Sequence, residues 1–291
     1  MTNPLPLYSM DSAPPPADVD VIILSLACDP ALRAVTERGI ATLRASEPAN
    51  AVRFRVLVIE SSKDALPFEG EGVTTIYPDE AFGYHTYMNI GLRQTQAPYV
   101  CLCNNDLVFH PGWATAILDA LRDDPALMST SPLCSLHHPT VGIHANEGIR
   151  YGYRVRSEIA GWCLFFRRSM LGTTGLLDER FRFWFADNDY ARTLESHGIK
   201  HALVTTAIVD HVESRTIKTQ GVVRQRLLTK KAKYDFDRKW NGMSAATHMR
   251  KLCQFYVKLA VLCIREVFGS GKAEDASAQR KSKHPSSARN H

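Results

Sequence analysis

The chain has 291 residues, of which 45% are hydrophobic and 22% are charged, a composition typical of a globular protein with a sizeable core. No apolar run reaches the roughly 18 residues that a membrane-spanning helix needs. The net charge of +5 is uneven, because residues 215–291 carry 18 Lys and Arg against 5 Asp and Glu, and residues 1–214 carry 17 against 25. The basic C-terminal part indicates an anionic partner, such as a phospholipid surface or a phosphorylated substrate.

The seven cysteines include no CxxC pair, and most of them lie in apolar runs. Cys101 and Cys103 would point to the same face of one strand. An odd number without a regular framework favours a reducing compartment and buried core cysteines, with a metal site or disulfides as the alternatives. Residues 1–18 are rich in proline and lack the basic and apolar regions of a secretory signal, so we expect a flexible leader.

The first predicted elements are a strand, a helix and a strand. The run VDVIILSL from residue 19 has the apolar character of a strand covered on both faces. Residues 31–46 have helical spacing, and residues 54–59 form the second strand. Ser25 and Glu60 would then lie at neighbouring strand ends, suited to a base and a ribose. Neither a GxGxxG motif after the first strand nor a P-loop is present, which disfavours a dinucleotide-binding Rossmann enzyme and a P-loop kinase.

The next predicted elements lead to a polar turn at the end of a buried strand. Residues 73–77 form a short strand, and residues 87–95 a helix that carries Asn89. The apolar run from residue 98 ends in Asn104, Asn105 and Asp106. Parallel sheets bind ligands at the carboxyl ends of their strands, where a carboxylate can hold Mg²⁺ or Mn²⁺ together with substrate phosphates. The alternative is an Asx turn that caps its own backbone.

The middle of the chain is harder to assign. We expect a helix at residues 113–121, a strand at 159–166 and a short helix at 167–177. Within the strand, Gly161 indicates that another group approaches the backbone closely. Residues 126–157 contain three histidines, but their spacing fits no standard zinc pattern and favours a polar loop over the active site. These histidines are His137, His138 and His144.

An aromatic stretch at residues 181–185 precedes two carboxylates, Asp187 and Asp189, at the start of a predicted helix. Acidic residues at this position commonly cap a helix and complement its dipole. Beside an aromatic wall that holds a sugar ring and excludes water, a carboxylate of raised pKa also suits a general base. The last predicted core strand covers residues 201–209 and is followed by His211.

Taken in order, these motifs resemble the family 2 glycosyltransferases of the GT-A type, and within them the bacterial rhamnosyltransferase-like members that build surface polysaccharides. The resemblance extends from residue 19 to about residue 242. It implies an α/β fold with a mostly parallel mixed sheet flanked by helices, and a catalytic domain at 19–245. The motifs are VIILSL, Glu60, Phe82-Gly83, Asn89, Gly91, Asn104-Asn105-Asp106, Gly161, Asp187-Asn188-Asp189 and His211.

The resemblance also implies roles for individual residues. Asp106 would be the metal ligand of a DxD-like motif, with His211 as a further metal or diphosphate ligand. Asp187 would be the catalytic base. Donor-binding roles fall to Ser25, Glu60, Asn89, Asn104, Asn105 and Asp106, and acceptor-binding roles to Trp184 and Asp189.

Two positions depart from the family pattern. Asn104 is neutral where the motif has an acid, so the metal would be held loosely or chiefly by the donor diphosphate. Ala186 replaces a glutamate, which leaves the choice of base open between Asp187 and Asp189.

The implied reaction is an inverting, metal-dependent hexosyl or deoxyhexosyl transfer. The donor would be a nucleotide-diphosphate sugar, and the acceptor a glycan or a polyprenyl-linked molecule in O-antigen, capsule or lipopolysaccharide biosynthesis. A catalytically silent nucleotide-sugar binding module is the alternative that Asn104 and Ala186 motivate. A basic nucleic-acid binder is a third hypothesis, but we expect no nucleic-acid partner.

The basic C-terminal part begins with residues 215–233, which could close over a diphosphate or form a solvated helix face. Residues 246–268 predict an amphipathic helix with Lys251, Gln254, Lys258 and Arg265 on one stripe. Through residues 247–268 this helix could lie in a membrane interface, or pack against the catalytic domain or a second subunit. We favour the membrane, at the cytoplasmic face of the plasma membrane, and expect residues 269–291 to be disordered.

Overall fold

The computed structural model describes residues 17–48, 50–212 and 222–261, and the side chains of 222–228 are not described. Residues 1–16 of the expected leader, Arg265 and the expected tail 269–291 lie outside the described residues. The chain divides into two compact units, residues 1–219 and 220–291. The predicted boundary of the catalytic domain at residue 245 stays a prediction.

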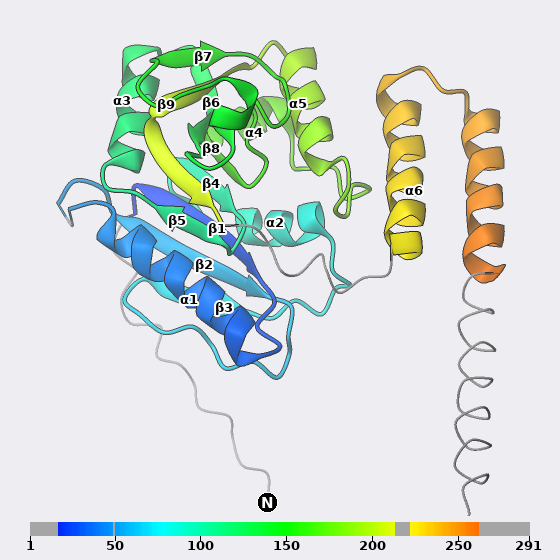
Figure 1. Ribbon diagram of the computed structural model, residues 1–291, viewed down its shortest axis with the longest axis horizontal. Coiled ribbons are helices and arrows are strands. Elements are labelled where there is room, and N and C mark those ends of the chain that lie inside the picture. The colour runs from blue at the N-terminus through cyan, green and yellow to red at the C-terminus, as the bar shows by residue number, and fades with distance from the viewer. Residues whose placement is uncertain (1–16, 49, 213–221, 262–291) are drawn as a thin grey trace, which may run out of the picture. The chain divides into compact units, whose positions relative to one another are not determined.

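In the described part of the first unit, nine strands form one sheet in the order β3-β2-β1-β4-β8-β6-β9-β5, with β7 paired to β9 (Figure 1). The strands are β1 Val19–Ser25, β2 Phe54–Glu60, β3 Val73–Ile76, β4 Tyr99–Cys103, β5 Leu107–Phe109, β6 Leu127–Leu133, β7 Ile149–Tyr151, β8 Cys163–Arg167 and β9 Lys200–His211. The helices of this unit are α1 Pro30–Ala45, α2 Tyr84–Arg93, α3 Trp113–Asp123, η1 His138–Val141, η2 Arg168–Met170, α4 Leu171–Thr174 and α5 Ala186–Ser196.

The sheet is mixed and mostly parallel. Strands β1, β2, β3 and β4 run in one direction, as do β6 and β9. Strand β8 lies between β4 and β6 and is antiparallel to both. The carboxyl ends of the parallel strands therefore share one edge of the sheet with the start of β8. This architecture confirms the predicted α/β fold class.

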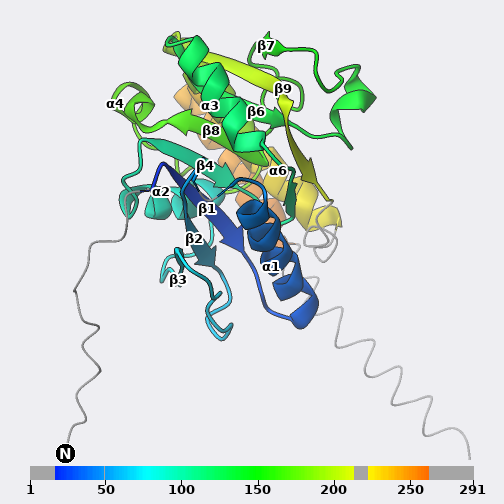
Figure 2. The same ribbon diagram turned by 90° about the vertical axis from the view of Figure 1, so that its left-hand side faces the viewer.

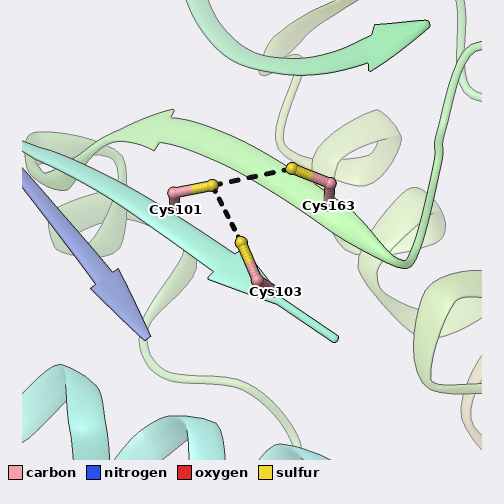
Figure 3. Close-up of side chains that lie close together, drawn as sticks. All are labelled: Cys101, Cys103 and Cys163. Carbon is pink, nitrogen blue, oxygen red and sulfur yellow. Dashed lines mark hydrogen bonds between the residues drawn. The ribbon is translucent and has the colours of Figure 1, made fainter. Parts of the chain in front are cut away.

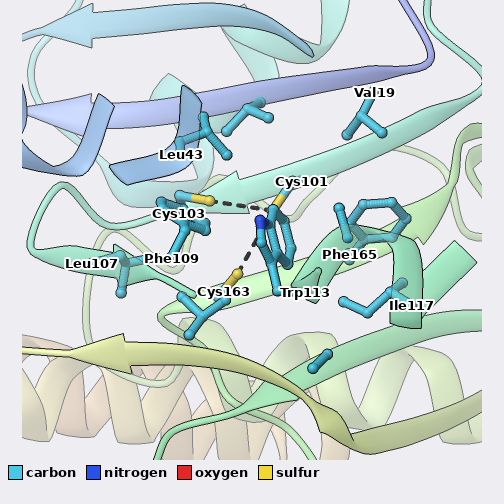
Figure 4. Packing of buried hydrophobic residues seen from close by; sticks show 14 of the residues in the cluster. Val19, Leu43, Cys101, Cys103, Leu107, Phe109, Trp113, Ile117, Cys163 and Phe165 are labelled. Carbon is cyan, nitrogen blue, oxygen red and sulfur yellow. Dashed lines mark hydrogen bonds between the residues drawn. The ribbon is translucent and has the colours of Figure 1, made fainter. Parts of the chain in front are cut away.

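Two layers of helices cover the sheet (Figure 1, Figure 2). Helices α1 and α3 pack on one face, around a cluster that includes Leu43, Trp113 and Phe165 (Figure 4). Helices α2, α4 and α5 pack on the other face, where Met88 and Leu194 are buried. Both faces of the sheet are thus withdrawn from water, which explains the continuous apolar runs in β1 and β4.

A buried network of ion pairs and hydrogen bonds connects the strands at the edge of the sheet opposite the carboxyl ends of the parallel strands. The fully buried Asp20 carboxylate accepts hydrogen bonds from Arg55 Nε at 2.7 Å and from Arg168 Nη2 at 2.8 Å. The backbone N–H of Ala97 donates to the same carboxylate at 2.6 Å. Asp20 therefore connects β1, β2 and the segments that flank β4 and β8.

The prediction of a loop at 126–157 is partly wrong, because the first residues of this range form β6 inside the sheet. Three polar residues of β6 are fully buried, and each has a partner. Ser129 Oγ lies 2.7 Å from the hydroxyl of Tyr190, Thr130 Oγ1 donates to a β8 carbonyl at 3.2 Å, and Ser131 Oγ accepts an N–H at 3.0 Å.

Two other predicted elements have different bounds. The strand expected at 159–166 begins only at Cys163, so Gly161 lies in the turn before it. The helix expected at 167–177 is two short pieces, η2 and α4, and it ends at Gly175, whose φ is +70°. A positive φ favours glycine and terminates helices.

The described part of the second unit contains helix α6 Val222–Trp240 and a further helix at 245–261. The two helices are joined by polar contacts within the unit. Asp235 accepts a hydrogen bond from Lys231 Nζ at 2.7 Å, and its other carboxylate oxygen lies 2.8 Å from His248 Nε2. Among the described residues, no helix combines the length and the apolar character that crossing a membrane requires.

Candidate active site

The predicted metal ligand Asp106 lies beside the end of the long strand β9. The short strand β5 pairs with β9 so that Leu107 faces His211, and the N–H of Val212 donates to the Asp106 carbonyl at 2.9 Å. As a result, His211 Nε2 lies 3.2 Å from Asp106 Oδ1. The structure therefore brings together two residues that are 105 positions apart in the sequence.

The Asp106 carboxylate is 7% exposed, and neither of its oxygens has a hydrogen-bond partner. The His211 nitrogen is close to one oxygen but is not aligned for a hydrogen bond. Burying an unsatisfied carboxylate is costly unless a cation compensates it. Asn104 adds a neutral side chain, with Nδ2 3.5 Å from His211 Nε2. The unsatisfied carboxylate oxygens of Asp106 and the imidazole nitrogen of His211 are ligand types that fit a divalent cation such as Mg²⁺ or Mn²⁺.

Trp162 supports this pair of residues, although the sequence analysis did not select it. Its indole ring stacks on the His211 imidazole, with the centroids 5.2 Å apart and the planes at 4°. Its carbonyl accepts a hydrogen bond from the N–H of Asn104 at 2.9 Å. Trp162 is 8% exposed, and its indole N–H has no partner. A signal was present in the sequence, because a bulky aromatic residue follows Gly161 at the start of a buried strand.

Glu60 is the last residue of β2, and its carboxylate lies at the end of that strand. Its Oε1 accepts hydrogen bonds from the N–H groups of Ala27 at 3.0 Å and Ser62 at 2.7 Å. Its Oε2 is buried and has no partner. Glu60 thus keeps one free acceptor at the same edge of the sheet as Asp106.

Ser25 and Asn105 are brought together by Thr36 of α1, which the sequence analysis missed. The Ser25 hydroxyl lies 3.0 Å from Thr36 Oγ1, and Asn105 Nδ2 donates to the same oxygen at 2.9 Å. The approach of the polar turn to α1 depends on Gly39, because a Cβ there would lie 3.0 Å from the Asn105 carbonyl oxygen. Both side chains have partners inside the protein, and their donor-binding roles stay predictions.

The hydrogen bonds of the Asn89 side chain are made with the segment after α4 and not with these strand ends. Its amide is 1% exposed and binds the segment after α4. Asn89 Nδ2 donates to the Leu177 carbonyl at 2.8 Å, and the Leu177 N–H donates back to Oδ1 at 3.0 Å. The contacts that the structure shows for Asn89 hold this segment, and a donor-binding role remains untested.

The predicted base Asp187 lies in the first turn of α5. Burial raises the pKa of the Asp187 carboxyl, although a hydrogen bond from the Asn188 N–H at 2.9 Å opposes this shift. The expected close approach at Gly161 is confirmed, because a Cβ there would lie 2.8 Å from Asp187 Cβ. Tyr84 fixes the same turn by donating its hydroxyl hydrogen to the Gly161 carbonyl at 3.1 Å.

The aromatic stretch before α5 turns sharply into the helix. Phe185 has a φ of +65°, a left-handed conformation that is uncommon for a bulky residue. Trp184 is half-buried and packs edge-on against Phe183, with the ring centroids 5.1 Å apart. Asp189 is only 2% exposed, whereas Asp187 is half-buried. The acceptor-binding roles of Trp184 and Asp189 stay predictions.

Two of the three histidines of the 126–157 stretch have backbone partners, namely His137 and His138. His138 is fully buried, accepts the Cys134 N–H at Nδ1 over 2.7 Å, and donates from Nε2 to the Ser157 carbonyl over 3.0 Å. Burial lowers its pKa, which keeps the ring neutral. His137 Nε2 lies 2.9 Å from the Arg156 carbonyl oxygen. The hydrogen bonds of these two rings therefore hold the segment after β6 in place.

The fold of the chain resembles that of GT-A glycosyltransferases. Residues 58–171 match the family model described as Glycosyl transferase family 2, and this match together with the fold supports a family 2 domain in the chain. No curated protein matches the sequence.

Two solved structures resemble the chain in fold. The first, "Mannosyltransferase PcManGT from Pyrobaculum calidifontis in complex with GDP-Man and Mn2+", is 14% identical with a TM-score of 0.53, over 90% of this chain and 82% of that one. The second, "Crystal structure of GalNAc-T7 with UDP, GalNAc and Mn2+", is 12% identical with a TM-score of 0.51, over 68% of this chain. This chain spans 44% of the length of that second protein.

Proposed function

We propose that this protein is an inverting, metal-dependent glycosyltransferase of the bacterial rhamnosyltransferase type. It transfers a hexosyl or deoxyhexosyl group from a nucleotide-diphosphate donor to a glycan or polyprenyl-linked acceptor in surface polysaccharide biosynthesis. The observation that carries the proposal is the Asp106 carboxylate, buried without a partner beside His211. The nucleotides and Mn²⁺ named for the two similar structures support it.

Asp106 and His211 would hold the divalent cation, which when bound neutralises negative charge on the departing diphosphate. Because Asn104 supplies no charge, Asp106 is the carboxylate that the described residues offer at this point, and the donor diphosphate completes the binding. The site is therefore expected to bind metal and donor together more tightly than either alone.

The free Oε2 of Glu60 supports a nucleotide at the neighbouring strand end. A buried acceptor without a partner gains a hydrogen bond when a ribose hydroxyl or a base N–H reaches it. Ser25 lies next to it in the sheet, since Ser25 and Glu60 are register partners. This geometry is consistent with donor binding across the ends of β1 and β2.

Asp187 acts as the general base and accepts the proton of the acceptor hydroxyl as its oxygen attacks the anomeric carbon. Its raised pKa makes it a stronger base than an ordinary carboxylate. We assign the role to Asp187 rather than Asp189 because Asp187 is the more exposed of the two, and a base must reach the acceptor. Attack on the face opposite the leaving diphosphate inverts the anomeric centre.

A thermal-shift panel of UDP, GDP, dTDP and CMP sugars tests the donor site. We expect one nucleotide class to stabilise the wild type with Mn²⁺ or Mg²⁺, and to lose this effect with EDTA or in Asp106→Ala. Sugar release from the stabilising donor then separates an enzyme from a silent binding module, which would protect the donor without consuming it. Stabilisation that is independent of both metal and Asp106 would contradict the proposed site.

The second unit is proposed to contact the cytoplasmic face of the plasma membrane. On the helix at 245–261, Met249, Tyr256, Val257 and Val261 are exposed apolar residues at helical spacing, and residues 215–291 are strongly basic. Both properties favour an anionic interface. The full chain should float with anionic liposomes, and a Met249→Glu, Val257→Glu variant should stay in the soluble fraction. Equal flotation of the two proteins would remove this part of the proposal.

A further inference from the structure

We propose that Cys101, Cys103 and Cys163 form a three-sulfur site for a soft monovalent cation, Cu(I). Figure 3 shows their side chains converging from β4 and β8. Cys101 Sγ lies 3.2 Å from Cys103 Sγ and 3.6 Å from Cys163 Sγ. All three sulfur atoms lie within 4.8 Å of one another. The cluster contains none of the residues proposed for sugar transfer, and the proposal does not rest on the proposed transferase activity.

The pairing of the two strands produces this convergence. Cys101 and Cys103 are two residues apart in β4, so their side chains point to the same face of the sheet. Cys163, the first residue of β8, is the register partner of Cys103. Because both strands are held by the sheet, the three ligand atoms are fixed before any cation binds.

The surroundings favour sulfur ligation over hydrogen bonding. The three cysteines are fully buried among apolar residues that include Val19, Trp113 and Phe165 (Figure 4). The contacts that the structure shows for these thiols are with one another. A single buried cysteine needs no explanation beyond packing, but three sulfur atoms that meet at one point provide the ligands that a thiophilic cation prefers.

The softness of the sulfur ligands indicates which cation the cluster takes. Burial raises the pKa of the Cys101 and Cys103 thiols. A thiol loses its proton when it coordinates a metal, so the bound cation has to offset this effect of burial, and thiolate sulfur binds soft cations most strongly.

The number of ligands argues against zinc. Structural zinc sites take four protein ligands in a tetrahedral arrangement. Among the described residues, this group offers three ligand atoms. Cu(I) is selected by soft sulfur ligands. A bound ion would link β4 to β8 just before the turn that carries Asp106.

Anaerobic titration of the reduced full-length protein with Cu(I), against a chromogenic Cu(I) chelator, tests the site. The exposed Cys28 and Cys253, together with Cys263, are replaced by serine in every protein so that they do not bind copper. We expect one Cu(I) per chain, with the affinity lowered by more than about 100-fold in Cys163→Ser. The control is Cys134→Ala, which removes a fully buried cysteine outside the cluster and should leave the affinity unchanged.

X-ray absorption at the copper edge keeps the test decisive if Cys163→Ser does not fold. On the copper-loaded protein we expect sulfur ligands alone. Three results would overturn the proposal: no copper retained against the chelator, equal retention by a folded Cys163→Ser, or nitrogen ligands in the absorption spectrum. A tetrahedral spectrum with stoichiometric Co(II) would also overturn the assignment to a monovalent, three-coordinate ion.

Discussion

Asp106 and Asp187 are carboxylates with different surroundings, and these surroundings separate their proposed roles. Asp106 has two unsatisfied oxygens next to an imidazole, which suits a cation. Asp187 is desolvated and held by a backbone N–H, and its pKa is raised, which suits a proton acceptor.

Replacing Asp187 by asparagine should slow sugar transfer by about 10² to 10⁴-fold, the usual contribution of a general base. Donor-induced thermal stabilisation should persist, because the proposed metal ligands are unchanged. In the wild type, the raised pKa means that Asp187 is protonated at a higher pH than an ordinary carboxyl. As the pH is lowered, the rate of sugar transfer should therefore begin to fall at a pH above the range in which an ordinary carboxyl group titrates. A near-normal rate in Asp187→Asn would exclude this residue as the base.

The glycine before Trp162 positions Asp187. In Gly161→Ala, the new methyl group would lie 2.8 Å from Asp187 Cβ and must displace it. We expect transfer to fall by at least about ten-fold, since a displacement of about 1 Å can cost 10²-fold, while donor binding is retained. The matched control is Gly172→Ala, where no atom lies within 4 Å of the added Cβ. Equal transfer rates in the two variants would contradict this positioning.

Among the elements, the apolar strands of the sheet were predictable from the sequence, whereas strand β6 was not. The apolar runs of β1, β2 and β4 are visible in the sequence because both of their faces are covered. Strand β6 reads LMSTSPL, and its polar residues are tolerated only because Tyr190, β8 and the turn before β8 supply partners. Such long-range compensation has no local signature.

The same distinction holds for the site. Polar residues that follow apolar runs in the sequence predicted Glu60 and Asp106 at the ends of strands. The structure places both residues there. Thr36 could not be found in this way, because it lies inside a helix and reaches the site only through the packing of α1. The predicted elements also gave no indication that β5 would pair with β9, which is what brings His211 to Asp106.

The network at Asp20 should be a strong determinant of stability among the elements. Asp20→Ala leaves Arg168 mostly buried without its carboxylate, and breaking a buried pair costs about 3–5 kcal/mol. The control is Asp18→Ala, which removes an exposed ion pair with Arg53 and should cost no more than about 1 kcal/mol. Urea unfolding measures both, and similar free energies of unfolding for the two variants would contradict the proposed difference.

At the scale of the whole molecule, a buried histidine should limit stability in acid. Burial lowers the pKa of His201 to about 4, and its ring nitrogens contact Ser129 Oγ at 2.8 Å and the Glu158 carbonyl at 3.0 Å. The unfolded chain has the ordinary pKa of about 6.5. Between these values the unfolded state binds a proton that the folded state does not, so stability falls as the pH decreases, by roughly 3 kcal/mol in total.

Urea unfolding at pH 7 and pH 5 tests this contribution. His201→Gln removes the titrating ring, so its stability should differ less between the two pH values than that of the wild type, whatever its absolute stability. The control His197→Gln replaces an exposed histidine at the end of α5 and should keep the difference seen in the wild type. An unchanged pH dependence in His201→Gln would exclude His201 as its source.

The position of β8 has a consequence for synthesis of the chain. Strand β8 lies between β4 and β6 in the sheet but follows both of them in the sequence. Until Arg167 has left the ribosome, the emerging polypeptide carries two unpaired strand edges that face an empty position. Such edges are templates for association with other chains. We therefore expect nascent chains stalled before residue 163 to depend on chaperones, and those stalled well beyond β9 to be protected.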